Sequence, residues 1–176
     1  VEFGVYYRRL PGEKHGSVVS LVGKEMLSVT GDGRSTLQDL ILRNDRAKLQ
    51  WEKLHDSFNG RLQTVIPEGV KIELVSIGNH ALGTKFINAN HLINEGLSRT
   101  FDEISNAIPG FYYGRYDLRC ASVDDLYAGN IKVMELNGCG AEPAHIYDPD
   151  FSFWEACAVQ IGHWNKIFRI ARANRK

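Results

Sequence analysis

Two neighbouring extended segments between residues 111 and 143 constrain the fold of this chain more than any other feature. The first reads Phe-Tyr-Tyr-Gly-Arg-Tyr-Asp-Leu-Arg, and the second, after a polar turn, reads Ile-Lys-Val-Met-Glu-Leu-Asn. Successive side chains of a strand point to opposite faces of a sheet. Each segment should therefore gather its polar groups on one face; these are Arg115, Asp117 and Arg119 in the first and Glu135 and Asn137 in the second.

If the two segments pair, two carboxylates, an amide oxygen and a guanidinium converge. Hard oxygen ligands suit magnesium, and the guanidinium fork matches a phosphate. The sequence alone leaves a second interpretation open, in which Asp117 and Glu135 form structural ion pairs with Arg115 and Arg119.

The composition is that of an ordinary globular protein and excludes several classes of function. The chain has 176 residues, of which 43% are hydrophobic and 24% charged, and its 21 Lys and Arg balance its 21 Asp and Glu. Because these charges balance, the protein has no overall positive potential that would favour nucleic acid or an acidic membrane as a partner. No stretch approaches the roughly 20 apolar residues of a membrane span, and the first residues do not show the basic-then-apolar pattern of a secretory signal. We expect neither a nucleic-acid nor a membrane partner.

Three cysteines without a Cys-x-x-Cys spacing imply neither a disulfide framework nor a zinc site. We expect reduced thiols and a cytoplasmic protein. The chain begins with Val1 inside a strand-like run, so we also expect it to have been cut from something longer.

Hydrophobic periodicity predicts alternating strands and helices along the chain. The expected elements are a hairpin over 1–22, helical segments over 37–41 and 45–57 (Leu49 and Leu54 inward), strands over 64–66 and 71–77, a polar loop over 78–86, an amphipathic helix over 97–108, a short helical turn at 123–126 and a long helix over about 152–173.

Several polar residues outside the paired segments are candidate ligand contacts, each with a plainer alternative. Lys24 is either a phosphate contact or a solvated lysine, and Asn79, His80 and Lys85 could orient a carboxylate or phosphate from their loop. The turn from Gly31 to Gly33 leads into a helix N-terminus and could hold an anion. Without a Gly-Lys-Thr it is not a P-loop, and we favour a purely structural turn there.

The long terminal helix carries a broad apolar stripe. Its members are Phe153, Trp154, Cys157, Ile161, Trp164, Phe168 and Ala171. Stripes of this kind usually pack into a core, and that is our expectation; a docking face is the alternative.

The ordered pair Arg-x-Asp at 115–117 and Glu-x-Asn at 135–137 resembles the C-terminal core of the ATP-grasp superfamily. The D-alanine–D-alanine ligases end their nucleotide site with a similar pair followed by a turn of small residues. The earlier Val-Thr-Gly-Asp-Gly-Arg-Ser-Thr-Leu stretch resembles a segment of cyanophycin synthetase and related carboxylate–amine ligases. The resemblance covers about residues 1–150 and implies an α+β fold, an antiparallel-rich sheet flanked by helices, as a single C-terminal-type domain over residues 1–176.

The resemblance also implies a reaction and a set of site residues. A carboxylate would attack the γ-phosphate of ATP, and an amine would capture the resulting acyl phosphate. Asp117, Glu135 and Asn137 would hold magnesium, and Arg115 would stabilise the transferring phosphoryl group or the tetrahedral intermediate. The resemblance further implies that Glu2 contacts the ribose and that Gly138, Gly140 and Glu142 lie beside the acceptor substrate. From the residues themselves we expect Lys24, Asn79 and Lys85 to contact the nucleotide and His80 to contact substrate.

ATP-grasp enzymes hold ATP between such a core and a preceding subdomain with a glycine-rich flap and lysines, and these 176 residues contain no such subdomain. We therefore expect this chain alone to bind Mg-ATP poorly. Two alternatives remain: a magnesium-dependent phosphohydrolase, for which no base is recognisable, and a non-catalytic interaction module.

Overall fold

A computed structural model describes residues 1–78 and 80–175, except for the side chain of His80. The chain divides into two compact units. The first comprises residues 1–24 and 86–176, and the second comprises residues 25–85. Each unit has its own hydrophobic core.

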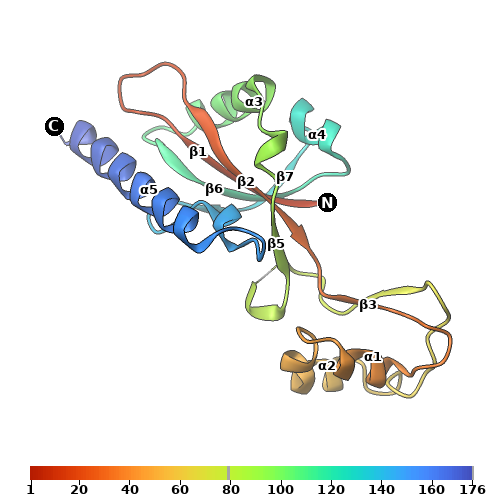
Figure 1. The fold of residues 1–176 in the computed structure, drawn as a ribbon. Coiled ribbons are helices and arrows are strands. Elements are labelled where there is room, and N and C mark those ends of the chain that lie inside the picture. The colour runs from red at the N-terminus through yellow and green to blue at the C-terminus, as the bar shows by residue number, and fades with distance from the viewer. Residues whose placement is uncertain (79, 176) are drawn as a thin grey trace. The chain divides into compact units, whose positions relative to one another are not determined.

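The elements of the first unit form a five-stranded sheet with helices on both faces (Figure 1). In chain order they are β1 (Glu2–Arg8), β2 (Ser17–Glu25), β5 (Lys85–Asn88), η3 (Asn90–Leu92), α3 (Glu95–Asn106), β6 (Tyr113–Arg119), α4 (Val123–Ala128), β7 (Lys132–Asn137), η4 (Ala144–Tyr147) and α5 (Phe153–Asn174). The strand order is β5-β2-β1-β6-β7, and β1 pairs antiparallel with both β2 and β6. The expected α+β fold with an antiparallel sheet flanked by helices is confirmed, as are the hairpin and the helical turn after β6.

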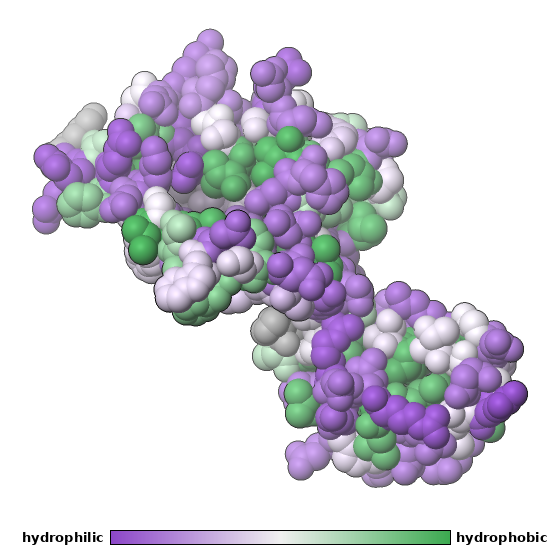
Figure 2. All heavy atoms as spheres, viewed as in Figure 1, coloured by the Kyte–Doolittle hydropathy of each residue, from purple (hydrophilic) through white to green (hydrophobic). Residues whose placement is uncertain are grey.

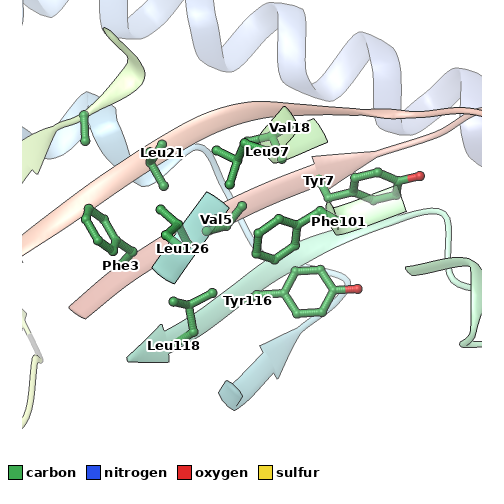
Figure 3. Close-up of a cluster of buried hydrophobic side chains, with 11 residues drawn as sticks. Phe3, Val5, Tyr7, Val18, Leu21, Leu97, Phe101, Tyr116, Leu118 and Leu126 are labelled. Atoms are coloured by element: carbon green, nitrogen blue, oxygen red, sulfur yellow. The ribbon is translucent and has the colours of Figure 1, made fainter. Parts of the chain in front are cut away.

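Alternation along β1 separates the core face of the sheet from its polar face. Phe3, Val5 and Tyr7 pack with residues of α3 and α4 in the main core, as Figure 3 shows. Phe101 of α3 lies 5.2 Å, centroid to centroid, from the ring of Tyr116 on β6. The opposite face carries the even-numbered residues of β1 and is the face against which α5 packs, because the α5 residue His163 meets the ring of Tyr6 at 5.1 Å.

The second unit is built from short elements around a smaller core. They are β3 (Ser28–Thr30), α1 (Leu37–Arg43), η1 (Lys48–Gln50), α2 (Trp51–Ser57), β4 (Lys71–Glu73) and η2 (His80–Leu82). Thr36 caps α1: its hydroxyl accepts from the Asp39 amide at 3.2 Å, and its own amide donates to the Asp39 carboxylate at 3.1 Å. This reciprocal capping box explains why the helix begins at Leu37.

Several sequence predictions for the second unit are wrong in detail. The strand expected over 71–77 ends at Glu73, and the strand expected over 64–66 is reduced to one isolated bridge between Thr36 and Val65. The segment from Asp45 is not one helix, because a 3₁₀ turn precedes α2. Leu49 lies in that turn and is 78% exposed, whereas Leu54 is buried as expected. The polar loop over 78–86 contains η2 and the start of β5.

Helix α5 matches its expected span to within one residue at each end, but its apolar stripe is not core. The exposed members are Phe153, Trp154, Ile161, Trp164 and Phe168, each at least 57% exposed. The buried residues of the helix are instead His163 and Ile170. In Figure 2, pale and green atoms interrupt the hydrophilic surface where α5 lies in Figure 1. No helix in the described part of the chain is long and apolar enough to span a membrane.

Candidate functional site

A buried ion-pair network lies at the centre of the polar face of the sheet. The ammonium of Lys24, on β2, lies 3.0 Å from Glu2 Oε1 and 3.0 Å from Asp117 Oδ1. The three side chains are 7%, 3% and 8% exposed. The second oxygen of Glu2 accepts from Arg119 Nε at 3.0 Å. Strand register builds the cluster, because β1 pairs Glu2 with Arg119 and Gly4 with Asp117.

The carboxylate of Asp117 also binds residues from its own strand and from β7. Its Oδ2 accepts from the Arg115 guanidinium at 3.2 Å and from Asn137 Nδ2 at 2.9 Å. Register pairs Arg115 with Asn137 and Asp117 with Glu135, so all four side chains belong to one face. Glu135 itself is exposed on the edge strand. The convergence predicted from the two extended segments is thus what the fold builds.

The chemistry of this cluster fits a magnesium ion. Asp117 Oδ1 is buried and accepts no hydrogen bond, although it lies within ion-pair distance of the Lys24 ammonium. The Lys24 ammonium already neutralises this buried oxygen, so a divalent ion at Asp117 would take the place of that ammonium. Across the described residues no three His, Cys, Asp or Glu side chains cluster as a metal site. The available donors are the carboxylates of Asp117 and Glu135 and the amide oxygen of Asn137, the hard oxygens that magnesium prefers.

Gly4 keeps space open beside Asp117. A Cβ at this position would lie 2.8 Å from a methyl of Val22 and 3.3 Å from both Arg115 Cδ and Asp117 Oδ1. Because Val22 is a short, fully buried side chain, it cannot move away cheaply. A glycine is therefore needed here because neighbouring side chains lie close to its backbone, and not because the backbone adopts a special conformation.

Four polar residues on the same face were not singled out from the sequence. Tyr6, Ser20, His145 and His163 are all buried. Ser20 Oγ and His145 Nδ1 are hydrogen-bonded at 2.7 Å, and burial lowers the pKa of both histidines. The hydroxyl of Tyr6 has no hydrogen-bond partner among the described residues, and burial raises its pKa. Side chains of β1 alternate between the two faces of the sheet, so the pattern that places Glu2 on the polar face places Tyr6 there too. This alternation could have identified Tyr6 from the sequence.

The turn after β7 lies next to this cluster in sequence and ties α5 to the sheet. Gly140 has φ +97°, and the carbonyl of Gly138 accepts from the Ala141 amide at 3.0 Å. Both oxygens of Glu142 are engaged: one accepts from the Tyr147 hydroxyl and the other from Gln160 Nε2 of α5 at 3.2 Å.

The other predicted contacts belong to the second unit. Lys85 is the first residue of β5, and His80 is the first residue of η2. Asn79 lies outside the described residues. The structural interpretation of the glycine turn fits its geometry, because the amides of Arg34 and Ser35, which an anion would need, donate to Asp32 Oδ1 at 2.9 and 2.7 Å.

Comparison with known proteins gives a likeness in structure. No family model and no curated protein sequence matches the chain. The structure is similar to that of a bifunctional glutathione synthetase from Pasteurella multocida, with a TM-score of 0.51 and 15% sequence identity. The alignment covers 94% of this chain and 24% of that one, so the chain spans about a quarter of that protein's length. At this identity the likeness concerns the fold, which is ATP-grasp-like.

Proposed function

We propose that this chain is the metal- and nucleotide-binding half of an ATP- and magnesium-dependent carboxylate–amine ligase. The observation that carries the proposal is the convergence of Arg115, Asp117, Glu135 and Asn137 on one face of the sheet, where the Asp117 carboxylate is buried. The ATP-grasp-like fold and the order of the two strand motifs support it.

The carboxylates of Asp117 and Glu135 and the amide oxygen of Asn137 would hold the magnesium. The ion would supply charge neutralisation between phosphate oxygens. Asn137 donates its amide NH₂ to Asp117 Oδ2, so the amide would turn over to bring its oxygen to a cation shared with Asp117. Arg115 is held by the same carboxylate and presents the rest of its guanidinium to anionic groups.

The chemical step is a transfer from ATP to a carboxylate. A carboxylate oxygen bonds to the γ-phosphorus as the bond to the ADP oxygen breaks, which gives an acyl phosphate and ADP. The amine then attacks the acyl carbon, loses a proton and displaces phosphate. Arg115 would stabilise the negative charge that develops on the phosphoryl oxygens or on the tetrahedral intermediate.

Lys24, Glu2, Asn79 and Lys85 are proposed nucleotide contacts. Lys24 and Glu2 are engaged with each other, so contact with a phosphate or a ribose requires one of these ion pairs to open. Lys24 is the counter-ion of Asp117, and a divalent cation bound to Asp117 would displace the Lys24 ammonium.

The turn residues Gly138, Gly140 and Glu142 are proposed to border the substrate, and a substrate contact by His80 stays a separate prediction. The open backbone of the two glycines would allow close approach. Glu142 would act by holding the turn against α5, because both of its oxygens already accept hydrogen bonds.

The test is nucleotide turnover by the full-length protein. We expect magnesium-dependent ADP release that requires both a carboxylate and an amine. Asp117→Asn and Glu135→Gln should abolish it while the circular dichroism spectrum stays native. Unchanged turnover in both variants would refute the metal assignment, and ATP loss without need of an amine would indicate a phosphohydrolase.

A non-catalytic interaction module is the second candidate. The observation that favours it is the apolar stripe on α5, whose five large side chains are exposed. Absence of nucleotide binding by the full-length protein would favour this alternative over the ligase.

A further inference from the structure

A half-buried guanidinium without a carboxylate partner lies at the far end of β1 from Glu2. Arg8 ends the strand on the same face as Glu2, Gly4 and Tyr6, and in the described part of the chain no acidic side chain pairs with it. Burial lowers its pKa. An unpaired charge removed from water is costly, so this position favours an anion.

Lys166 of α5 and Arg8 both line two cavities. One has a volume of about 280 Å³ and is also lined by Arg9 and His15. The other has a volume of about 380 Å³ and is also lined by His145 and His163. Arg8 and Lys166 line both cavities, so they form the wall common to the two. Figure 1 shows α5 running along the sheet at this place.

The charged groups that line these cavities are mostly cationic. Among the described lining residues the acidic side chain is that of Glu13, which belongs to the first cavity alone and is exposed. Its backbone oxygen accepts from Arg9 at 2.9 Å, so Arg9 is already engaged. The second cavity, nearer to the centre of the sheet, is lined by cationic and neutral groups only.

The strand register fixes how far this cleft lies from the reacting centre. On β1, Gly4 pairs with Asp117 and Tyr6 pairs with Arg115. Arg8 lies two residues beyond Tyr6 on the same face, roughly 7 Å along the strand, and roughly 13 Å beyond Gly4. Tyr6 lies between these two positions on the strand, and its side chain is buried against His163 of α5.

We propose that Arg8 and Lys166 form a subsite for a second, distal carboxylate of the substrate whose reacting carboxylate is activated beside Arg115. The substrate class is an extended dicarboxylate whose two acid groups lie on the order of 7–13 Å apart. The proposal rests on the proposed ligase function for the identity of the reacting end. A planar guanidinium fork and a mobile ammonium that line the same cavities suit a carboxylate, which accepts two parallel hydrogen bonds from arginine.

The experiment measures binding and turnover with a matched panel of probes. Linear α,ω-dicarboxylates from succinate to sebacate, and the monocarboxylates of equal length, are titrated calorimetrically into the full-length protein without nucleotide. The same acids are then supplied with ATP, magnesium and an amine, and ADP release is followed. Variants are Arg8→Gln, Lys166→Gln and, as the charge-matched control, Arg169→Gln, an exposed arginine of the same helix.

We expect a longer dicarboxylate to bind at least about tenfold more tightly than its monocarboxylate, and Arg8→Gln or Lys166→Gln to remove that preference. Arg169→Gln should retain it, and Arg8→Lys should restore part of it. In Asp117→Asn the dicarboxylate should still bind while ADP release is lost.

Failure of the subsite and failure of the ligase give different results. Equal affinity for mono- and dicarboxylates in the wild type, or a preference that survives Arg8→Gln, overturns the subsite even where ADP release is robust. Weaker ATP binding in Arg8→Gln with unchanged dicarboxylate binding also overturns it, because the cleft would then hold phosphate. If dicarboxylate binding depends on Arg8 but no ADP is released, the subsite is supported and the proposed ligase function is refuted.

Discussion

Replacement of Lys24 by methionine tests the buried network at its centre. The substitution keeps the length of the side chain but removes the ammonium that lies 3.0 Å from both Glu2 and Asp117. Breaking a buried ion pair from one side costs about 3–5 kcal/mol. The two acids keep their arginine partners, Arg119 and Arg115, so we expect a value near the lower end, about 3 kcal/mol. For a chain of this length that corresponds to a fall in Tm of roughly 6–12 °C.

The same variant reports on the metal. If Asp117 is a magnesium ligand, Lys24→Met removes the competing cation, and magnesium should bind the variant more tightly than the wild type. Bound magnesium then stabilises the fold by about 1.4 kcal/mol at ten times its Kd. Thermal unfolding in magnesium chloride, compared with sodium chloride at equal ionic strength, measures the effect. Lys14→Met, at an exposed lysine of the same unit, is the control.

Two results would refute this reasoning. A variant as stable as the wild type to within about 0.5 kcal/mol would mean that the buried ion pairs contribute little. A large loss of stability that magnesium does not relieve would mean that Asp117 is held by its ion pairs for the fold alone.

Three further predictions concern packing and pH. Gly4→Ala should destabilise the first unit by about 1–3 kcal/mol in urea unfolding, and weaken magnesium binding, because its Cβ would lie 2.8 Å from a buried methyl. Gly31→Ala would place a Cβ against the backbone oxygen of Pro67, so hydrogen exchange should accelerate over residues 25–85 and not elsewhere. Because burial lowers the pKa of His145 and His163 below 6.5, the unfolded state binds more protons in acid, and stability should fall by up to about 1.4 kcal/mol per pH unit per histidine below pH 6.5. The double variant His145→Asn/His163→Asn should show a flatter urea-midpoint profile between pH 7.5 and 5.5, and an equally steep one would contradict this assignment.

The sheet could be predicted from the sequence because its strands are amphipathic. In β1 and β6, alternation separates one face that packs against α3 and α4 from another that carries the charges. Helix α1 could also be predicted from the sequence, because Thr36 caps its N-terminus. In the second unit, β-strand propensity predicted too long a strand. The β-rich run that begins at Lys71 pairs for only three residues, because its partner β3 is itself three residues long.

The candidate site was predicted in part. Arg115, Asp117 and Asn137 are neighbours across two strands close in sequence, so local register sufficed to place them. The pairing of Lys24 with Asp117 and of Arg119 with Glu2 depends on β1 lying between β2 and β6, which no local pattern specifies. The apolar stripe of α5 misled the prediction, since periodicity identifies a helix face but not what that face contacts.

The proposed reaction transfers the γ-phosphoryl group to a carboxylate, and the source of the oxygen in the released phosphate tests this step most directly. The full-length protein would turn over ATP with magnesium, a carboxylate and an amine in water enriched in heavy oxygen, and the phosphate would be analysed by mass spectrometry. An acyl-phosphate ligase takes the new phosphate oxygen from the carboxylate, so we predict phosphate without label from water. Phosphate carrying one oxygen from water would contradict the ligase and identify direct hydrolysis.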